Sequence, residues 1–157
     1  LSGHSSKCAI PHGHNEFVRI SLCALESDPL NNTDNMVTDF ASAKKRWHQF
    51  IDEQLDHSFQ LRHDDPLIDY FQTHEPHQIQ RLVITPGDPT TEMLCACLMS
   101  KLDALLQGQN SILNCVKIEL EETPTNTVIL SGQKAYLPHL PLGDYWWNRN
   151  DLTINDL

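Results

Sequence analysis

Long apolar runs are absent from this sequence: it has no stretch of about eighteen consecutive apolar residues, the length that a membrane-spanning helix needs. No basic region leads into an apolar stretch either, so we expect neither a membrane span nor a signal peptide. Positive charge is also scarce, since 11 Lys and Arg residues stand against 21 Asp and Glu residues, a net charge of -10. Nucleic-acid binding depends on a concentrated basic face, so we expect no nucleic-acid partner.

Cysteine is present in an odd number, five, and most of the five lie inside regular segments rather than in loops that disulfides would join. This pattern indicates reduced thiols in a cytoplasmic protein. No internal repeat or low-complexity segment appears. The 157 residues, 39% of them apolar, are enough to bury one core, and we expect a single domain over residues 1–157.

The first regular segment follows a group of histidines. Residues 17–25 alternate, with Val18, Ile20 and Leu22 on one side, which predicts a half-buried strand. The stretch "ESDPLNNTDN" (26–35) is dense in turn formers and joins this strand to "MVTDF" (36–40), a second short extended segment. We expect a hairpin-like connection between the two.

A helix is predicted after Asp39, whose carboxylate suits the N-cap position. This helix should lie across the face of a sheet, because apolar residues recur in it at three- and four-residue steps: Phe40, Ala43, Trp47, Phe50, Ile51 and Leu55.

Residues 62–80, by contrast, are polar, contain two prolines and show no sustained period, which indicates a long surface excursion.

The stretch "RLVITPGDPTTEMLCACLMSKLDALLQ" (81–107) predicts a strand, a Pro-Gly turn and a helix capped by Thr90. Residues 115–122 and 127–137 predict two further strands. We therefore expect an α+β fold, in which two helices cover one face of an antiparallel sheet and the sheet edges are available for oligomerisation. The apolar stripe of the second helix contains Leu94, Leu98, Leu102 and Leu105.

The stretch "CAIPHGHN" (8–15) contains residues suited to catalysis and metal binding. On an extended segment, His12 and His14 present both imidazoles to one side, and two neutral imidazoles make half of a zinc site. A nearby cation would favour the thiolate of Cys8, four residues upstream of the first histidine. The alternative is a polar surface turn ahead of a strand.

Two further patterns contain carboxylates. Asp56 precedes His57 in "LDHSF", and a carboxylate can hold an imidazole ready for proton transfer. Glu121 and Glu122 end an alternating strand, where a buried carboxylate could accept two N–H donors from a planar heterocycle. Adjacent Asp-His pairs are usually structural and strand-end glutamates are usually exposed, so both interpretations stay open at this point.

Cys95 and Cys97 do not suit a shared metal ion, because residues two apart on a helix point in different directions. We expect them to pack in or near the core, as we do for Cys23 and Cys115. The doubled tryptophan in "GDYWWNRN" (143–150) is typical of a packing anchor for a tail, against this chain or another subunit. It is therefore not a candidate for the site.

Five motifs occur in a particular order between residues 7 and 126: "KCAIPHGHN", "NMVTDF", "LDHSF", "DPTTEML" and "IELEETPTN". In this order they resemble the family of 6-pyruvoyltetrahydropterin and 6-carboxytetrahydropterin synthases. A single motif of this kind has little specificity, whereas five in register make the resemblance specific.

The resemblance implies roles for residues that match the family motifs. Glu122 and Thr123 would bind the pterin ring, with Glu121 as the neighbouring candidate. The segment "PTTE" (89–92) would have a structural role at the start of the second helix. The catalytic residues would be Cys8, Asp56 and His57, and the zinc ligands His12 and His14.

The resemblance also implies the tunnelling fold, a four-stranded antiparallel sheet with two helices packed on one face, assembled as a homohexamer of two trimers. The family's first zinc ligand lies on an N-terminal strand, and we expect this strand to be truncated in this sequence. We expect this third ligand upstream of Leu1 rather than at His4. We also expect a long insertion near residues 62–80 and a C-terminal extension near residues 138–157.

The activity implied by the resemblance is that of a zinc-dependent lyase, which converts 7,8-dihydroneopterin triphosphate to 6-carboxy-5,6,7,8-tetrahydropterin in the queuosine pathway. Alternatives are the 6-pyruvoyl product of the tetrahydrobiopterin pathway and a non-catalytic oligomer that binds a pterin or a metal. Dihydroneopterin side-chain cleavage is disfavoured, because relatives of that kind tend to carry a glutamate in place of Cys8. The triphosphate-binding residues stay open among Arg19, Lys44, Arg46 and Arg62.

Overall fold

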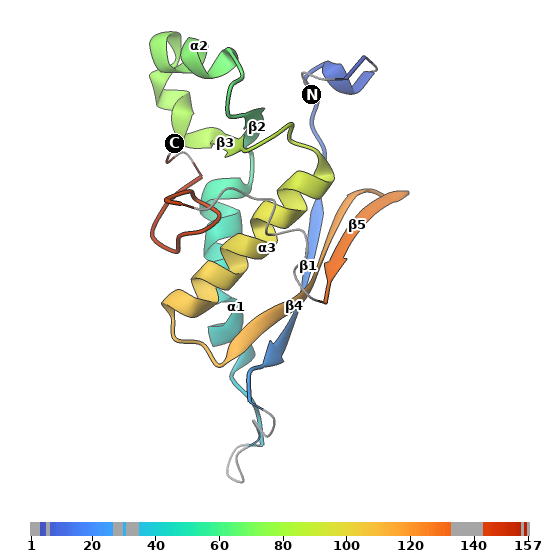
Figure 1. Ribbon diagram of the computed structural model, residues 1–157, viewed down its shortest axis with the longest axis vertical. Helices are drawn as coiled ribbons and strands as arrows, with labels where there is room; N and C mark the ends of the chain where they lie inside the picture. The colour runs from blue at the N-terminus through green and yellow to red at the C-terminus, as the bar shows by residue number, and fades with distance from the viewer. Residues whose placement is uncertain are drawn as a thin grey trace.

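The structure is a computed structural model that describes residues 4, 5, 7–26, 30, 35–132, 143–154 and 156. Parts of the predicted turn region at 26–35, of the strand at 127–137 and of the extension at 138–157 lie outside the described residues. Helices and an antiparallel sheet pack together, and a smaller sheet lies at one end of the molecule (Figure 1). The predicted α+β class is confirmed.

In the described part of the chain, the larger sheet contains three antiparallel strands rather than the expected four. In spatial order they are β1 (Phe17–Ala24), β4 (Leu113–Thr123) and β5 (Asn126–Ser131). Residues of β1 are alternately exposed and half-buried, and the even-numbered ones face inward as predicted. The central strand β4 pairs with both neighbours, so it sets the positions of β1 and β5.

Two residues predicted to share one face of β4, Val116 and Ile118, do not share it. The register of β4 against β1 shifts here and leaves Val116 as an extra, half-buried residue, a β-bulge. Ile118 is buried after the shift, whereas Leu113 and Cys115 are the buried residues before it. The bulge therefore changes the inward-facing positions from odd-numbered before it to even-numbered after it, while the strand keeps one face toward the core.

The first helix, α1 (Phe40–Phe50), begins where the sequence predicts. The Asp39 carboxylate accepts a hydrogen bond of 2.7 Å from the backbone N–H of Ser42 and caps the helix. Phe40 is 80% exposed, so the predicted apolar stripe was wrong at its first residue. The stripe begins at Ala43, which packs against the core one turn later.

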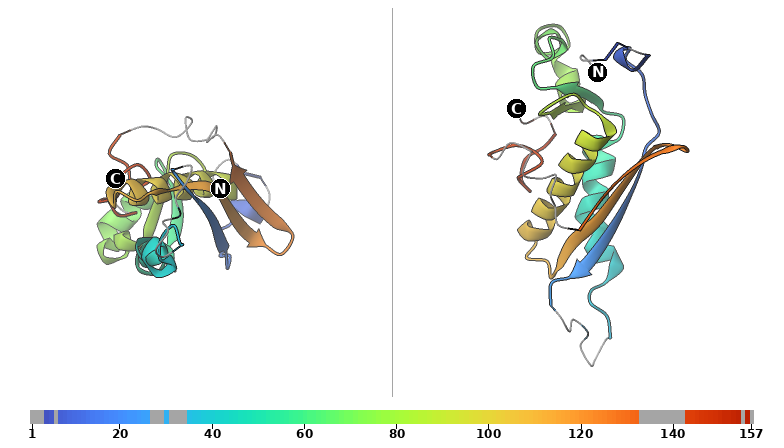
Figure 2. Two further views of the ribbon diagram at one scale, coloured as in Figure 1. Left: turned by 90° about the horizontal axis from the view of Figure 1, so that it is seen from below. Right: turned by 45° about the vertical axis from the view of Figure 1, so that its right-hand side comes forward.

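The long helix α3 (Thr91–Gly108) supplies much of the core. Its N-cap is Thr90, whose hydroxyl accepts a hydrogen bond of 3.2 Å from the N–H of Met93. All four leucines of the predicted stripe are buried, and so are both cysteines of the helix. The helix is buried around much of its circumference because the sheet packs against it on one side and the tail packs on another (Figures 1 and 2). Among the described residues, no helix has both the length and the apolar character needed to cross a membrane.

The smaller sheet corrects the prediction for residues 62–80. This segment is not a featureless excursion, because α2 (Leu67–His74) and a 3-10 helix (Pro76–Arg81) form a crossover between two parallel strands. A helix of eight residues is too short to show a sustained period in the sequence. The strands are β2 (Phe59–Arg62) and β3 (Leu82–Thr85), and their small core contains Leu61, Ile68, Leu82 and Ile84.

Two other predictions were wrong. The segment "MVTDF" forms no strand, because Val37 and Thr38 bend and Asp39 then caps α1. Cys23 is exposed rather than packed, because it occupies an odd-numbered position of β1, on the face away from the core. None of the five cysteines forms a disulfide.

The tryptophan pair anchors the tail within its own chain, as one of the two predicted readings has it. Trp146 and Trp147 are both buried in the main core. The indole Nε1–H of Trp146 donates a hydrogen bond of 2.8 Å to the Ile84 carbonyl at the end of β3. Its ring stacks on Phe50 of α1 at 6.0 Å between centroids. Trp146 therefore connects α1 to β3.

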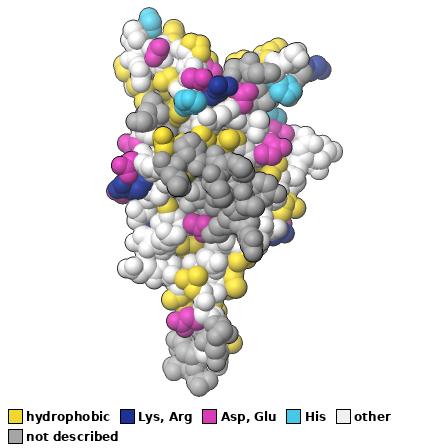
Figure 3. Space-filling view, viewed as in Figure 1, with side chains coloured by type: hydrophobic (Ala, Val, Ile, Leu, Met, Phe, Trp, Pro, Cys, Tyr) yellow, Lys and Arg dark blue, Asp and Glu magenta, His cyan; other side chains and the backbone are white. Residues whose placement is uncertain are grey.

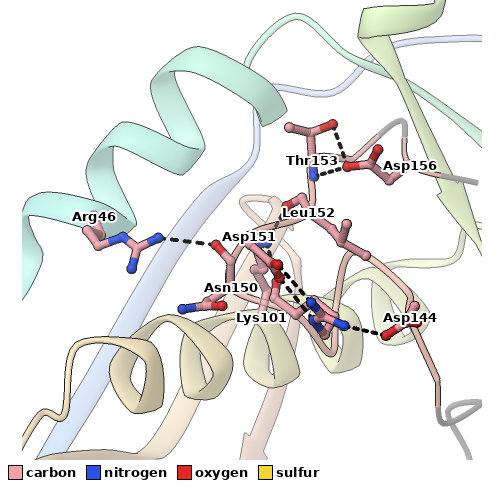
Figure 4. A network of polar contacts seen from close by, with 9 residues as sticks. Arg46, Lys101, Asp144, Asn150, Asp151, Leu152, Thr153 and Asp156 are labelled. Atoms are coloured by element: carbon pink, nitrogen blue, oxygen red, sulfur yellow. Dashed lines mark hydrogen bonds and ion pairs between the residues drawn. The ribbon is translucent and has the colours of Figure 1, made fainter.

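Polar contacts hold the rest of the described tail against α3 and α1 (Figure 4). The Lys101 ammonium, on α3, donates hydrogen bonds of 2.7 Å to the carbonyls of Arg149 and Leu152. Arg46, on α1, donates a hydrogen bond of 3.1 Å to the Asn150 carbonyl. Two helices therefore bind backbone carbonyls of the same tail segment.

Candidate functional site

A cleft of about 1140 Å³ lies at the end of the molecule that carries the smaller sheet. Its walls come from the N-terminal residues, the end of α1, strand β2, the start of α3 and the β4–β5 hairpin. Figure 3 shows this end hollowed between the part that carries α2 and the part that carries the N-terminal residues. The predicted site residues that line the cleft are Cys8, His12, His14, Asp56, His57 and Glu122.

His12 and His14 lie in a segment without regular secondary structure that precedes β1. Their ring centroids are 4.8 Å apart and the ring planes are nearly perpendicular, at 79°. Nδ1 of His12 lies 2.6 Å from the Ile10 carbonyl oxygen. Because a carbonyl only accepts, Nδ1 carries the proton and Nε2 keeps a lone pair suited to a metal ion.

The two imidazoles fit zinc by ligand type, but the part of the chain that the structure describes offers no complete site. No group of three or more His, Cys, Asp or Glu side chains in it could hold a metal ion. Nε2 of His14 lies 3.7 Å from Oε1 of Glu122, and His4 lines the same cleft, but neither completes a set. A catalytic zinc takes three protein ligands, of which this pair would supply two.

Cys8 lies on a short 3-10 turn, Lys7–Ala9, at the N-terminal wall of the cleft. The backbone N–H of Ile10 donates a hydrogen bond of 3.1 Å to the Lys7 carbonyl and closes the turn. The thiol belongs to an exposed residue, unlike the buried Cys95. An accessible thiol can exchange a proton with a bound molecule, whereas a buried one is inert.

Asp56 and His57 follow a π-helical turn, Ile51–Leu55, that extends α1. Oδ2 of Asp56 lies 2.9 Å from Nδ1 of His57. This contact holds the imidazole in the tautomer that leaves Nε2 without a proton. The pair and Cys8 come from distant segments and line one cleft, so the cleft contains two kinds of group that can transfer protons.

Of the two glutamates near the end of β4, Glu122 lines the cleft. Its Oε1 accepts a hydrogen bond of 2.9 Å from the Thr91 hydroxyl at the start of α3. Glu121 instead accepts a hydrogen bond of 2.9 Å from Arg19 of β1, and it is not a lining residue. Thr123, the other predicted pterin contact, does not line the cleft in this structure.

Glu16 lines the cleft and was missed by the sequence reasoning. It is half-buried, two residues before Val18. Burial raises the pKa of its carboxyl above the ordinary value, and the charge of Glu122 adds to this shift. The sequence contained a signal for this residue, because the inward-facing, even-numbered series of β1 reaches Glu16 if it is extended by one step.

The cleft is acidic. Arg62 is the one Lys or Arg side chain among the described residues that line it. An acidic wall repels anions, so any anionic group of a ligand must be placed near this arginine or be neutralised by cations. The carboxylates that line the cleft are Glu16, Asp52, Asp56, Asp65, Asp88, Glu92 and Glu122.

Comparisons with known proteins give a consistent result. A family model described as 6-pyruvoyl tetrahydropterin synthase matches residues 1–133. The chain is 33% identical to the 6-carboxy-5,6,7,8-tetrahydropterin synthase of Rickettsia felis over 125 residues, which are 79% of this chain and 85% of the relative. It is 32% identical to the enzyme of the same name from Rickettsia bellii, also over 125 residues and with the same shares of 79% and 85%.

A solved structure, that of an uncharacterized protein from Wolinella succinogenes, is similar with a TM-score of 0.60 and 27% identity. The similarity covers 80% of this chain and 81% of the other, which supports the shared fold. The family match at 1–133 includes every predicted site residue and the whole larger sheet, and it ends before the described tail. This chain therefore belongs to the 6-pyruvoyl tetrahydropterin synthase family.

Proposed function

We propose that this protein is a zinc-dependent lyase that converts 7,8-dihydroneopterin triphosphate to 6-carboxy-5,6,7,8-tetrahydropterin. The observation that carries the proposal is that a thiol, an Asp-His pair, two imidazoles and a glutamate line one cleft. Family membership supports a role as a pterin synthase. The names of the Rickettsia relatives support the 6-carboxy product over the 6-pyruvoyl product.

Glu122 would bind the pterin ring. A carboxylate can accept two parallel N–H donors from a planar heterocycle, and the pterin ring offers such a pair. The Thr91 hydroxyl, 2.9 Å from Oε1, would keep the carboxylate oriented, and each carboxylate oxygen would still have a lone pair for one N–H of the ligand. Thr123 stays a proposed contact that would need a local change to reach the ring.

Cys8 and His57 would transfer protons. Cleavage of the side chain needs an acid and a base near one carbon, and these two residues come from different walls of the cleft. Asp56 would keep Nδ1 of His57 protonated, so that Nε2 takes or returns the proton. Zinc held by His12 and His14, with a third ligand outside the described residues, would polarise the hydroxyls of the substrate side chain.

Arg62 is the best-supported contact for the triphosphate among the four candidates that the sequence left open. Arg19 is paired with Glu121 and Arg46 is bonded to the Asn150 carbonyl, and neither lines the cleft. Lys44 borders a separate shallow groove on α1. Arg62 currently pairs with Asp64, which lies outside the cleft lining, and its guanidinium could exchange this partner for a phosphate.

Assembly, location and pathway form part of the same proposal. We expect the tunnelling fold and a homohexamer, and both outer strands of the three-stranded sheet, β1 and β5, would serve as edges for pairing. The protein would act in the cytoplasm, in the queuosine pathway. The net charge of -10 is compatible with a small-molecule substrate and with no nucleic-acid partner.

Two observations favour other functions. The family description names 6-pyruvoyl tetrahydropterin, which supports the tetrahydrobiopterin-pathway product as the second candidate. The two-imidazole set in the described residues supports a non-catalytic pterin- or metal-binding oligomer.

Product identification separates these functions. The zinc-loaded protein is incubated with 7,8-dihydroneopterin triphosphate, and the products are analysed by mass spectrometry. The proposal predicts the 6-carboxy product together with acetaldehyde. Pyruvoyl product without acetaldehyde would select the second enzyme, whereas stoichiometric zinc with no turnover of any dihydropterin would select the binding protein.

A further inference from the structure

The side chains of Asp56 and His57 pack little against the rest of the protein. The His57 side chain is 88% exposed and the Asp56 side chain is 62% exposed. A proton-transfer group must nevertheless be held close to its productive geometry, since a displacement of about 1 Å can cost about 100-fold in rate. The backbone must therefore supply the positioning that packing does not.

The backbone at this pair is unusual. The N–H of Asp56 donates a hydrogen bond of 2.8 Å to the Ile51 carbonyl, five residues back, and this closes the π-helical turn. His57 then has a φ of 57°, in the left-handed region that non-glycine residues seldom occupy. Such a conformation is unfavourable for a non-glycine residue and persists only where the surroundings hold it.

Arg81, at the end of the crossover between β2 and β3, supplies such a support. Its Nη1 donates hydrogen bonds of 3.3 Å to the Glu53 carbonyl and 3.2 Å to the Asp56 carbonyl. The Asp56 carbonyl belongs to the peptide unit that joins Asp56 to His57, so this bond fixes the peptide plane ahead of the left-handed residue. The guanidinium also places a positive charge at the end of a helix, where carbonyls have no partner in the helix itself.

The pairing of β2 with β3 in the smaller sheet holds Arg81 in place. Arg81 is the last residue of the 3-10 helix Pro76–Arg81, and the next residue, Leu82, is paired with Phe59 in the parallel register of β2 and β3. Phe59 lies only two residues after His57. The strand pairing therefore brings Arg81 next to the pair that its side chain contacts.

We propose that Arg81, the last residue of the crossover between β2 and β3, is a positioning residue for the Asp56–His57 proton-transfer pair. The inference rests on the proposed function, in which His57 moves a proton. It assigns Arg81 no contact with the substrate, since Arg81 does not line the cleft.

The test compares Arg81→Gln and Arg81→Lys with His77→Gln, a control on the same 3-10 helix whose ring pairs with Glu75 instead. Arg81→Gln is expected to lower kcat about 30-fold, because the peptide plane is released, with KM changed less than about twofold. Arg81→Lys, which still carries a donor and a charge, is expected to restore most of kcat. A kcat of Arg81→Gln within twofold of wild type, or an equal loss in His77→Gln, would overturn the inference.

Amide hydrogen exchange provides a readout that does not depend on turnover. The N–H groups of Asp56 and Ser58 are bonded to the carbonyls of Ile51 and Leu55. Their exchange is expected to accelerate at least about tenfold in Arg81→Gln and to stay unchanged in His77→Gln. If wild type turns over no dihydropterin, the proposed function fails, and exchange alone then decides the role of Arg81: unchanged exchange overturns it.

Discussion

At the scale of single residues, spacing along the chain predicted the site residues that lie within one segment. Cys8, His12 and His14 line one cleft because the consecutive residues 8–16 form one wall of it. Arg62 stayed one of four open candidates and Arg81 was not assigned, since their positions depend on strand pairing and on contacts between distant segments. A single sequence does not contain that information in local form.

The role of Arg62 can be tested by separating the triphosphate from the pterin. Arg62→Gln is expected to raise KM for dihydroneopterin triphosphate about tenfold or more, the usual cost of a lost charged hydrogen bond. The inhibition constant of dihydroneopterin, which has no phosphate, should change less than about twofold because the ring contacts remain. Arg19→Gln serves as the matched control, since it removes an arginine paired with Glu121 outside the cleft. Equal effects of Arg62→Gln on both ligands would contradict this role.

Lys101 gives a prediction for pH dependence. It is 1% exposed, and burial, together with the charge of Arg46, lowers its pKa from the ordinary 10.5 to about 8. Between these values the unfolded chain holds more protons than the folded one, so the free energy of unfolding rises with pH from about 8 to about 10.5.

Comparison with Lys101→Met isolates this contribution. From pH 7 to pH 9.5, the free energy of unfolding of the wild type should rise by about 2 kcal/mol relative to that of Lys101→Met. Urea unfolding at several pH values measures the difference. If the free energies of unfolding of the two proteins changed in parallel with pH, the predicted lowering of the Lys101 pKa would be wrong.

At the scale of elements, the two long helices were predicted because local chemistry specifies both. Asp39 and Thr90 are caps in the sequence and in the structure, and each precedes a sustained apolar period. Helix α2 was not predicted, since eight residues are stabilised mainly by packing, in this case of Ile68 against β2 and β3. The parallel pairing of β2 with β3 is long-range and left no local pattern beyond the strand at 82–85.

The packing of the tail on α3 leads to a stability prediction at Gly108. A Cβ at this position would overlap the Asn150 side chain, with the Cγ only 2.6 Å away. Gly108→Ala should therefore destabilise the protein by about 1 kcal/mol, although alanine is otherwise favoured in a helix by about that amount. In an Asn150→Gly background the same substitution should become neutral or stabilising. Urea unfolding of the four proteins gives the coupling, and equal effects in both backgrounds would rule out this contact as the cause.

At the scale of the whole molecule, the family match and the described tail divide the chain into two parts. Residues 1–133 contain the larger sheet, both long helices and every predicted site residue. The described tail adds Trp146 and Trp147 to the same core. The tail therefore adds packing at the end of β3, close to the turn that leads into the cleft wall at Asp88.

The central claim is that the cleft holds one substrate between the Cys8 thiol and the Asp56–His57 pair and converts it. The most direct test measures the rate of product formation from dihydroneopterin triphosphate by wild type, Cys8→Ala and Cys23→Ala, each loaded with zinc. Cys23 is the matched control, because its residue is also exposed but lies outside the cleft. We predict that Cys23→Ala retains at least half of the wild-type rate and that Cys8→Ala is at least about 100-fold slower, the usual effect of removing a general acid or base. Equal rates for Cys8→Ala and wild type, or no turnover by wild type, would contradict the account.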